Sequence, residues 1–218
     1  MIELQRDGDV RILRMDEGEN RFSPGFLDQL EKALGELESA EGPRALVTIG
    51  TGKFFSNGLD LEWLTANPDR FEPYLDRVHA VFARFLTLPM PTVAALNGHA
   101  FAAGAMLALT HDQAVMRSDR GYFCLPEVDL GLSFTPGMAA LIQARLPRAI
   151  AHEAMLTGRR YAAPDACEAS IVQRHVPEAE VLPTAVAMAA PLAAKDGATV
   201  GRIRTAMYEP VLAALSSR

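Results

Sequence analysis

Two short segments of the chain place backbone N–H groups where the neighbouring side chains are small. In GKFFSNGLDL (residues 52–61), Gly58 is free to adopt a positive φ, and Leu59 follows it where a loop leads into a helix. In AFAAGAML (residues 100–107), Ala103 lies at the start of an expected helix, whose first N–H groups lack partners and carry the positive end of the dipole. Two such donors, when they converge, form an oxyanion hole for an enolate or a tetrahedral alkoxide. Each segment alone is also typical of a close helix contact that needs small residues.

A carboxylate further along the chain favours a catalytic site over simple packing. Glu127 lies in YFCLPEVDLG (residues 122–131), which predicts a strand or a loop. A carboxyl group beside an oxyanion hole can remove and return a proton, and an apolar pocket raises its pKa towards neutrality. Without the other two segments, the same glutamate is typical of a solvated loop. His99 and His111 have no partner at the spacing of a metal site or a catalytic triad, so we expect both to be structural.

Strands that alternate with helices must position these segments. Residues 2–15 predict a hairpin that turns at residues 7–9, and a helix is expected after Ser23, which can cap it ahead of Pro24. Further strands are expected at residues 45–50, 92–96, 113–116 and 171–176, and further helices at residues 71–88, 102–109, 136–146, 148–156 and from 178 to the end. This alternation predicts an α/β fold with mainly parallel strands.

Composition limits the class of protein that these elements build. The chain has 218 residues, of which 49% are hydrophobic and 22% charged, as is typical of one soluble domain. Its net charge of −6 argues against a nucleic-acid partner and against an anionic membrane surface. No apolar run approaches the ~18 residues of a membrane span, and the N-terminus lacks the apolar core of a secretory signal. Cys124 and Cys167 lie far apart, without the spacing of a zinc site or a disulfide framework, and such free thiols predict a reducing, cytoplasmic location.

The order and the intervals of three segments give a specific resemblance. GKFFSNGLDL, PMPTVAALNGHAFAAGAMLAL (residues 89–109) and LPEVDLGL (residues 125–132) are similar to motifs of the enoyl-CoA hydratase/isomerase (crotonase) superfamily. With ENRFSP (residues 19–24) and HDQAVMRSDRG (residues 111–121), the chain is most similar to the plant peroxisomal Δ3,Δ2-enoyl-CoA isomerases. This resemblance, which covers about residues 1–175, implies an α/β spiral of ββα units with a helical C-terminal region, and a coenzyme A thioester as substrate.

The resemblance also implies roles for single residues. The backbone N–H groups of Leu59 and Ala103 match the family's oxyanion donors, and Glu127 matches a catalytic carboxylate. Hydratases of the family use a second glutamate, and here that position is Met106, a thioether that can neither take nor give a proton. One carboxylate is enough to move a double bond from C3–C4 to C2–C3, because it can remove a proton from C2 and return it at C4. We therefore expect an enoyl-CoA isomerase that uses neither a metal nor a redox cofactor.

Two other interpretations of the same residues remain. Asp129 or Glu62 could supply the missing group for hydration or for thioester hydrolysis, although local hydrogen bonding or a helix-dipole role is the simpler expectation for each. The chain could also be a non-catalytic acyl-CoA-binding relative that has lost the chemistry. The presence of Glu127 argues against the second interpretation.

Binding residues follow from the resemblance in the same way. Coenzyme A is expected to meet the loop that contains Arg21 and Phe22, and the stretch from 53 to 58, of which we select Lys53, Ser56, Asn57 and Gly58. Candidates for the acyl pocket are Leu64, Met106, Leu132 and Phe134.

The end of the chain is expected to form a region of its own, with residues 1–190 as the core and residues 191–218 as a C-terminal helical region. Apolar residues recur there near helical spacing, and Pro210 is expected to end or kink a helix. The resemblance implies a homotrimer or hexamer built through this region. It also suggests that Arg202 or Arg204 lies near a coenzyme A phosphate. The apolar residues are Val200, Ile203, Met207, Val211 and Leu215.

Overall fold

Six strands form the main sheet in the computed structural model, which describes residues 1–217. The sheet has the order β1-β2-β3-β5-β7-β9. The first two strands pair antiparallel through the hairpin at Gly8, and all the other pairs are parallel, which confirms the expected pairing. The strands are β1 (Ile2–Asp7), β2 (Val10–Met15), β3 (Ala45–Gly50), β5 (Thr92–Leu96), β7 (Gln113–Arg117) and β9 (Arg174–Val176).

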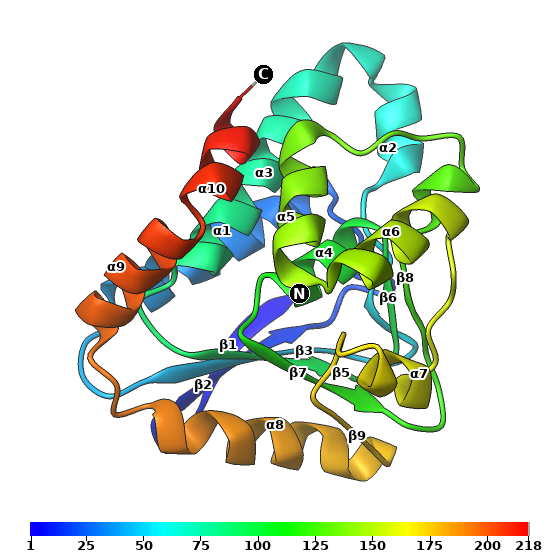
Figure 1. Cartoon of the computed structure of the whole chain (residues 1–218). Helices are drawn as coiled ribbons and strands as arrows, with labels where there is room; N and C mark the ends of the chain where they lie inside the picture. Colours follow the sequence, from blue (N-terminus) through cyan, green and yellow to red (C-terminus); the bar gives the residue numbers. More distant parts are fainter. Residues whose placement is uncertain (218) are drawn as a thin grey trace.

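Three short parallel strands form a second sheet, in the order β4-β6-β8. Each of them directly follows a strand of the main sheet and precedes a helical segment, so the chain winds through successive ββα units (Figure 1). The expected spiral is therefore present. Residues 122–131 contribute only a two-residue strand and then a 3₁₀ turn at Pro126–Val128, rather than one extended segment. The short strands are β4 (Phe54–Ser56), β6 (His99–Phe101) and β8 (Phe123–Cys124).

The two faces of the main sheet are covered differently, because successive strand residues point to opposite sides. Leu13 and Leu46 face the larger core, which is formed with α1 (Pro24–Ser39), α3 (Phe71–Thr87) and α4 (Ala103–Leu109). Ile12 and Val47 face α8 (Val181–Ala189), which packs across the opposite face (Figure 1). The remaining helices are α2 (Leu61–Ala66), α5 (Pro136–Arg145), α6 (Arg148–Thr157), α7 (Ala163–Glu168), α9 (Gly197–Met207) and α10 (Glu209–Ser216).

The C-terminal helices pack on the rest of the chain. Val211 and Leu215 of α10 are buried in the larger core, where α10 contacts α3 and α5. Ile203 and Met207 of α9 are exposed. The apolar residues of α10 are therefore buried, whereas those of α9 face solvent. The break between α9 and α10 lies just before Pro210, where a helix was expected to end or kink.

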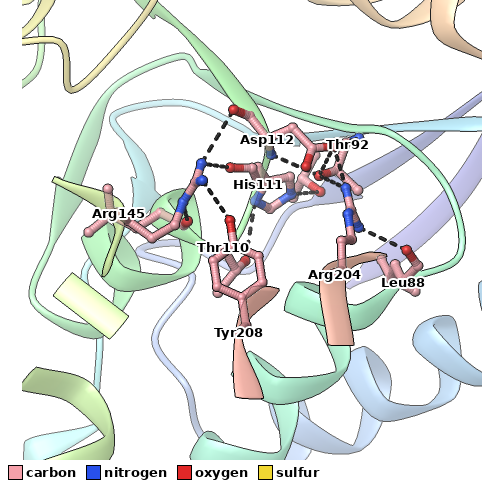
Figure 2. A network of polar contacts seen from close by, with 10 residues as sticks. Leu88, Thr92, Thr110, His111, Asp112, Arg145, Arg204 and Tyr208 are labelled. Atoms are coloured by element: carbon pink, nitrogen blue, oxygen red, sulfur yellow. Dashed lines mark hydrogen bonds and ion pairs between the residues drawn. The ribbon is translucent and has the colours of Figure 1, made fainter. Parts of the chain in front are cut away.

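A buried polar network fastens these helices, and it corrects the expectation for Arg204 (Figure 2). The Arg204 guanidinium is buried, forms an ion pair with Asp112, and donates to the Leu88 carbonyl at 2.8 Å. Arg145 donates to the Leu109 carbonyl at 2.7 Å and to the Tyr208 hydroxyl at 2.8 Å (Figure 2). Since a buried guanidinium needs its charge compensated within the protein, Arg204 is committed to this network and not to a coenzyme A phosphate.

His111 belongs to the same buried region, and its expected structural role is confirmed. Its Nδ1 lies 2.9 Å from the Leu107 carbonyl and its Nε2 lies 2.8 Å from the Thr48 hydroxyl. Complete burial lowers the pKa of His111 to about 4, so the ring is neutral at physiological pH. No helix within the described part of the chain combines the length and apolar character needed to cross a bilayer.

Candidate active site

The loop after β4 and the start of α4 converge at Gly58. This residue has φ +83°, and a Cβ added to it would lie 3.0 Å from the Ala103 nitrogen and 2.9 Å from the Phe101 carbonyl oxygen. Glycine is required here both for the backbone conformation and for the close approach of the two segments. The loop is held from behind, because the Gly58 N–H donates to the Ser56 hydroxyl at 3.2 Å and the Phe22 N–H donates to the Gly58 carbonyl at 2.8 Å.

The N-terminus of α4 presents its backbone without a side-chain cap. Ala102, the residue before the helix, has φ +50°, a conformation that costs energy for a residue with a Cβ. Gly104 allows the helix to press against β4, since a Cβ there would lie 2.3 Å from the Ser56 carbonyl oxygen. Within residues 1–217 the N–H groups of Leu59 and Ala103 make no hydrogen bond. Two free donors therefore meet at the surface of one cavity, as the two sequence motifs predict.

Glu127 faces the same cavity from the 3₁₀ turn after β8. Its side chain is 7% exposed, and its Oε2 atom is buried without a hydrogen-bond partner among the described residues. Burial raises the pKa of Glu127 from 4.5 to about 7, and the Glu127 backbone N–H offsets only part of this effect. The turn is rigid, because the Glu127 carbonyl accepts from the N–H groups of Leu130 at 3.1 Å and Leu132 at 2.9 Å. A carboxyl group with this pKa can both accept and return a proton near neutral pH.

The cavity has a volume of about 700 Å³ and brings together most of the residues selected from the sequence. Its lining contains Glu127 as the single carboxylate among the described residues, and Met106 lies in the same wall. The predicted residues that line it are Arg21, Asn57, Leu59, Leu64, Ala103, Met106, Glu127, Leu132 and Phe134.

Four of the residues selected for substrate binding do not line the cavity. Phe22 is fully buried in the larger core and stacks against Phe26 with ring centroids 5.8 Å apart. Ser56 is fully buried and donates to the Asn20 carbonyl at 2.7 Å. Gly58 is buried and, unlike Leu59, does not line the cavity. The motif makes these three residues supports of the loop rather than contacts of a ligand. Lys53 is exposed outside the cavity, with its ammonium group 5.2 Å from the centroid of the Phe54 ring.

The acidic residues considered as a second catalytic group also lie outside the cavity. Glu62 is exposed in the first turn of α2, where it complements the helix dipole. Asp129 is exposed, and it does not share a face with Glu127 because the segment is a 3₁₀ turn and not an extended strand. Arg202, the other candidate for a coenzyme A phosphate, is exposed on α9 and donates to Thr199.

Several residues of the cavity wall were not found from the sequence. They come from loops, from the first turns of helices, from the short strands β6 and β8 and, for Leu75, from the apolar stripe of α3, and none of these positions distinguishes a cavity wall from a core by its sequence pattern. Arg160 is exposed at the edge of the cavity, with its guanidinium 5.9 Å from the centroid of the Phe101 ring. Cys124 also lines the cavity, and burial raises the pKa of its thiol to about 11, so it is not a nucleophile at neutral pH. The additional wall residues are Leu61, Phe71, Leu75, Phe101, Ala102, Cys124, Pro126, Leu130, Ser133, Thr135, Met138 and Arg160.

The charged groups of the cavity are few. The Arg21 guanidinium forms an ion pair with Glu19 at 2.7 Å, and Arg160 is the other cation in the lining. Among residues 1–217, no cluster of three or more histidine, cysteine, aspartate or glutamate side chains could hold a metal ion. The cavity of the described residues therefore combines two backbone N–H groups and one buried carboxyl group with mostly apolar walls.

Comparison with known proteins identifies the family. The model of the family described as enoyl-CoA hydratase/isomerase matches residues 8–217. This chain belongs to the enoyl-CoA hydratase/isomerase family. The family member named enoyl-CoA delta isomerase 2, peroxisomal, from Arabidopsis thaliana is 38% identical over 95% of this chain and 92% of its own length. Carnitinyl-CoA dehydratase from Escherichia coli K12 is 35% identical over 84% of this chain and 71% of its own length.

The solved structures support the same fold. A crystal structure of an enoyl-CoA hydratase/isomerase family protein from Pseudomonas syringae superposes with a TM-score of 0.92. It covers 98% of this chain and 93% of its own, at 22% identity. At that identity the similarity establishes the crotonase-like architecture, and the chemistry has to be argued from the site itself.

Proposed function

We propose that this protein is a Δ3,Δ2-enoyl-CoA isomerase. The observation that carries the proposal is that, among residues 1–217, Glu127 is the single carboxylate lining a cavity that also contains the N–H groups of Leu59 and Ala103, which have no hydrogen-bond partner there. Relatives that are 32–38% identical and named enoyl-CoA delta isomerases support the same reaction. A hydratase needs a second group to activate water, and the side chain at the corresponding position of the wall is Met106.

The proposed reaction uses these groups in the following way. The Glu127 carboxylate takes a proton from C2 of a 3-enoyl thioester, and the electron pair of the broken C–H bond moves onto the thioester oxygen. The N–H groups of Leu59 and Ala103 donate to this oxygen and stabilise the dienolate. Glu127 then returns the proton to C4, the double bond forms between C2 and C3, and the thioester carbonyl is restored. A proton changes position and no electron is gained or lost, so the proposal includes neither a redox cofactor nor a metal.

The coenzyme A part of the substrate is proposed to leave the cavity past Arg21 and Asn57. Both side chains line the cavity next to Leu59, and Glu19 orients them, since it accepts from Arg21 at 2.7 Å and from Asn57 at 2.9 Å. Arg160 supplies a second positive charge at the cavity edge. The protein is also proposed to be a homotrimer or a pair of trimers, in keeping with the resemblance noted for its sequence.

The decisive experiment is to incubate the purified protein separately with a 3-enoyl-CoA and a 2-enoyl-CoA. An isomerase converts the 3-enoyl-CoA to the conjugated 2-enoyl thioester and does not hydrate the 2-enoyl-CoA. Rapid hydration of the 2-enoyl thioester would favour the hydratase alternative. Binding without conversion of either substrate would favour a non-catalytic acyl-CoA-binding protein.

A further inference from the structure

Three successive backbone N–H groups in the loop after β4 have different partners. The Gly58 N–H donates to the Ser56 hydroxyl at 3.2 Å, and the Asp60 N–H donates to the Tyr74 hydroxyl at 3.1 Å. The Leu59 N–H lies between them and makes no hydrogen bond within residues 1–217. Two side-chain hydroxyl groups therefore hold the N–H groups on either side of the donor proposed for the oxyanion hole.

A tight turn at Asp60 fixes the peptide group that follows Leu59. The Leu61 N–H donates to the Leu59 carbonyl at 3.1 Å, and Asp60 has φ −82° and ψ 82°, close to an inverse γ-turn. The carbonyl end of the peptide group between Leu59 and Asp60 is thus bonded to Leu61, and its N–H end is bonded to Tyr74. A change in the conformation of Leu59 that turns this peptide group breaks at least one of the two bonds.

Tyr74 is a firmly held acceptor for this bond. It belongs to α3 and is 3% exposed, and its ring lies 5.5 Å from the ring of Trp63. The Trp63 N–H in turn donates to the Asp60 carboxylate at 3.1 Å, so the tyrosine ring and the turn are joined at two points. Burial raises the pKa of Tyr74 above its ordinary value of 10.0, so the hydroxyl stays neutral at physiological pH.

We propose that Tyr74 is a positioning residue for catalysis, whose hydroxyl holds the Asp60 N–H so that the Leu59 N–H points at the thioester oxygen of the substrate. This inference rests on the proposed function. Leu59 lines the cavity and Tyr74 does not, so the tyrosine acts through the loop without touching the substrate. It lies 14 positions after Asp60 on another helix, outside the segment that carries the oxyanion motif.

Loss of the Tyr74 hydroxyl leaves the Asp60 N–H without its acceptor. An N–H group shielded from water is costly to leave unpaired, so the peptide group turns towards another partner and the Leu59 N–H moves with it. Removal of a whole oxyanion donor lowers kcat by about 10²–10³-fold. A donor that is displaced keeps part of its effect, and we therefore expect a fall in kcat of about ten-fold.

Tyr74→Phe tests the inference, because it removes the hydroxyl and keeps the ring. We expect kcat for a 3-enoyl-CoA to fall about ten-fold, while the Kd of hexanoyl-CoA changes by less than about two-fold. The fall should be the same at every pH, because Glu127 is unchanged. Tyr161→Phe is the matched control and should keep the wild-type kcat, since Tyr161 is fully buried outside the cavity and donates to Glu153 at 2.6 Å.

The carbonyl stretching frequency of bound hexanoyl-CoA, labelled with ¹³C at the thioester carbon, measures the donor without turnover. A hydrogen bond to the thioester oxygen lowers this frequency, so the wild type should shift it from the value of the free thioester and Tyr74→Phe should shift it less. In a Leu59→Pro background, which lacks the N–H, Tyr74→Phe should change neither this frequency nor kcat further.

An unchanged carbonyl frequency in Tyr74→Phe would overturn the inference, whether or not kcat falls. An equal loss of activity in Tyr161→Phe, or a loss of hexanoyl-CoA binding as large as the loss of kcat, would also overturn it. A wild type that shifts the frequency but does not convert a 3-enoyl-CoA refutes only the isomerase, and the frequency of Tyr74→Phe then decides the role of Tyr74 alone. A wild type that isomerises without shifting the frequency refutes the Leu59 donor and, with it, the role of Tyr74.

Discussion

Replacing Glu127 by glutamine should remove activity and, at the same time, remove the loss of stability that the wild type undergoes as pH rises from 4.5 to about 7. Glu127 is 7% exposed, and its Oε2 atom has no hydrogen-bond partner among the described residues. Its burial raises the pKa from 4.5 to about 7, so ionisation is unfavourable in the folded state. Each pKa unit corresponds to about 1.4 kcal/mol, and ionised Glu127 therefore costs the native state about 3 kcal/mol.

The sign of the pH dependence follows from the number of bound protons. Between pH 4.5 and about 7 the folded protein holds the Glu127 proton and the unfolded chain has lost it. The free energy of unfolding of the wild type therefore falls as pH rises through this interval. The cost is absent below pH 4.5 and fully present above about 7. Glu127→Gln lacks this titration, although its buried amide adds an offset that does not change with pH.

Urea unfolding of the wild type and Glu127→Gln, at fixed protein concentration between pH 4 and pH 8.5, measures the effect. The variant should gain about 3 kcal/mol relative to the wild type from the lowest to the highest pH, since all other titrations are shared. Glu62→Gln, which changes an exposed glutamate outside the cavity, is the matched control for the loss of a carboxylate. If the difference in free energy of unfolding between Glu127→Gln and the wild type does not change with pH, the inference that the Glu127 carboxylate is buried without a partner is refuted.

The activity of the same variant completes the test. Loss of a general acid–base group typically lowers turnover by 10²–10⁴-fold, and we expect about 10³-fold or more for isomerisation by Glu127→Gln. In the wild type, kcat/KM should fall about ten-fold per pH unit below pH 7, because the base must be ionised. Wild-type kcat in Glu127→Gln would overturn the catalytic assignment.

Further expected outcomes concern the backbone donors, the packing of the site and the assembly. Leu59→Pro removes an N–H and should lower kcat by about 10²–10³-fold with acyl-CoA binding retained, whereas Leu59→Ala should have little effect; equal effects of the two would exclude this donor. Gly104→Ala places a Cβ 2.3 Å from the Ser56 carbonyl oxygen. It should lower the free energy of unfolding, measured by urea titration, by about 1–3 kcal/mol, and it should also lower kcat in the isomerase assay. Asp112→Ala leaves the buried Arg204 charge without its partner and should cost roughly 3 kcal/mol in the same titration. Light scattering at micromolar concentration should give a trimeric or hexameric mass, and a monomer would contradict the proposed assembly.

The chemical groups of the site could be predicted because short, local motifs carry them. Leu59 and Ala103 follow or lie next to small residues whose conformations and contacts admit few alternatives, and Glu127 follows a proline that fixes its turn. Sequence spacing does not report whether two such motifs meet in space. The two motifs are brought together by the short strands β4, β6 and β8. Each of these strands has only two or three residues, which is too few to show the two-residue period of a strand in the sequence.

The cavity walls were less predictable than the convergence of Leu59, Ala103 and Glu127 on one cavity. Leu75 lies on the apolar stripe of α3 together with Val78 and Phe82, and all three fit a core position equally well by spacing. Val78 and Phe82 are fully buried, whereas Leu75 is only partly buried and lines the cavity. Periodicity identifies the face of a helix that avoids water, and only the packing of neighbouring elements decides which part of that face meets protein and which part is left for a ligand.

Arg204 shows the same limit for a charged residue. An arginine near the end of a chain, on a helix with exposed neighbours, is most simply expected at the surface, where it could meet a phosphate. The ion pair with Asp112 joins residues 92 positions apart in the chain. A further hydrogen bond runs from Arg204 to the carbonyl of Leu88, the residue that ends α3. Since Arg145 also ties Tyr208 to the carboxyl end of α4, the C-terminal helices are fastened to the helix whose opposite end supplies the Ala103 N–H (Figure 2). The polar network of the C-terminus is thus joined to the helix that carries the proposed donor, by contacts between residues too far apart in the chain for a local sequence pattern to predict.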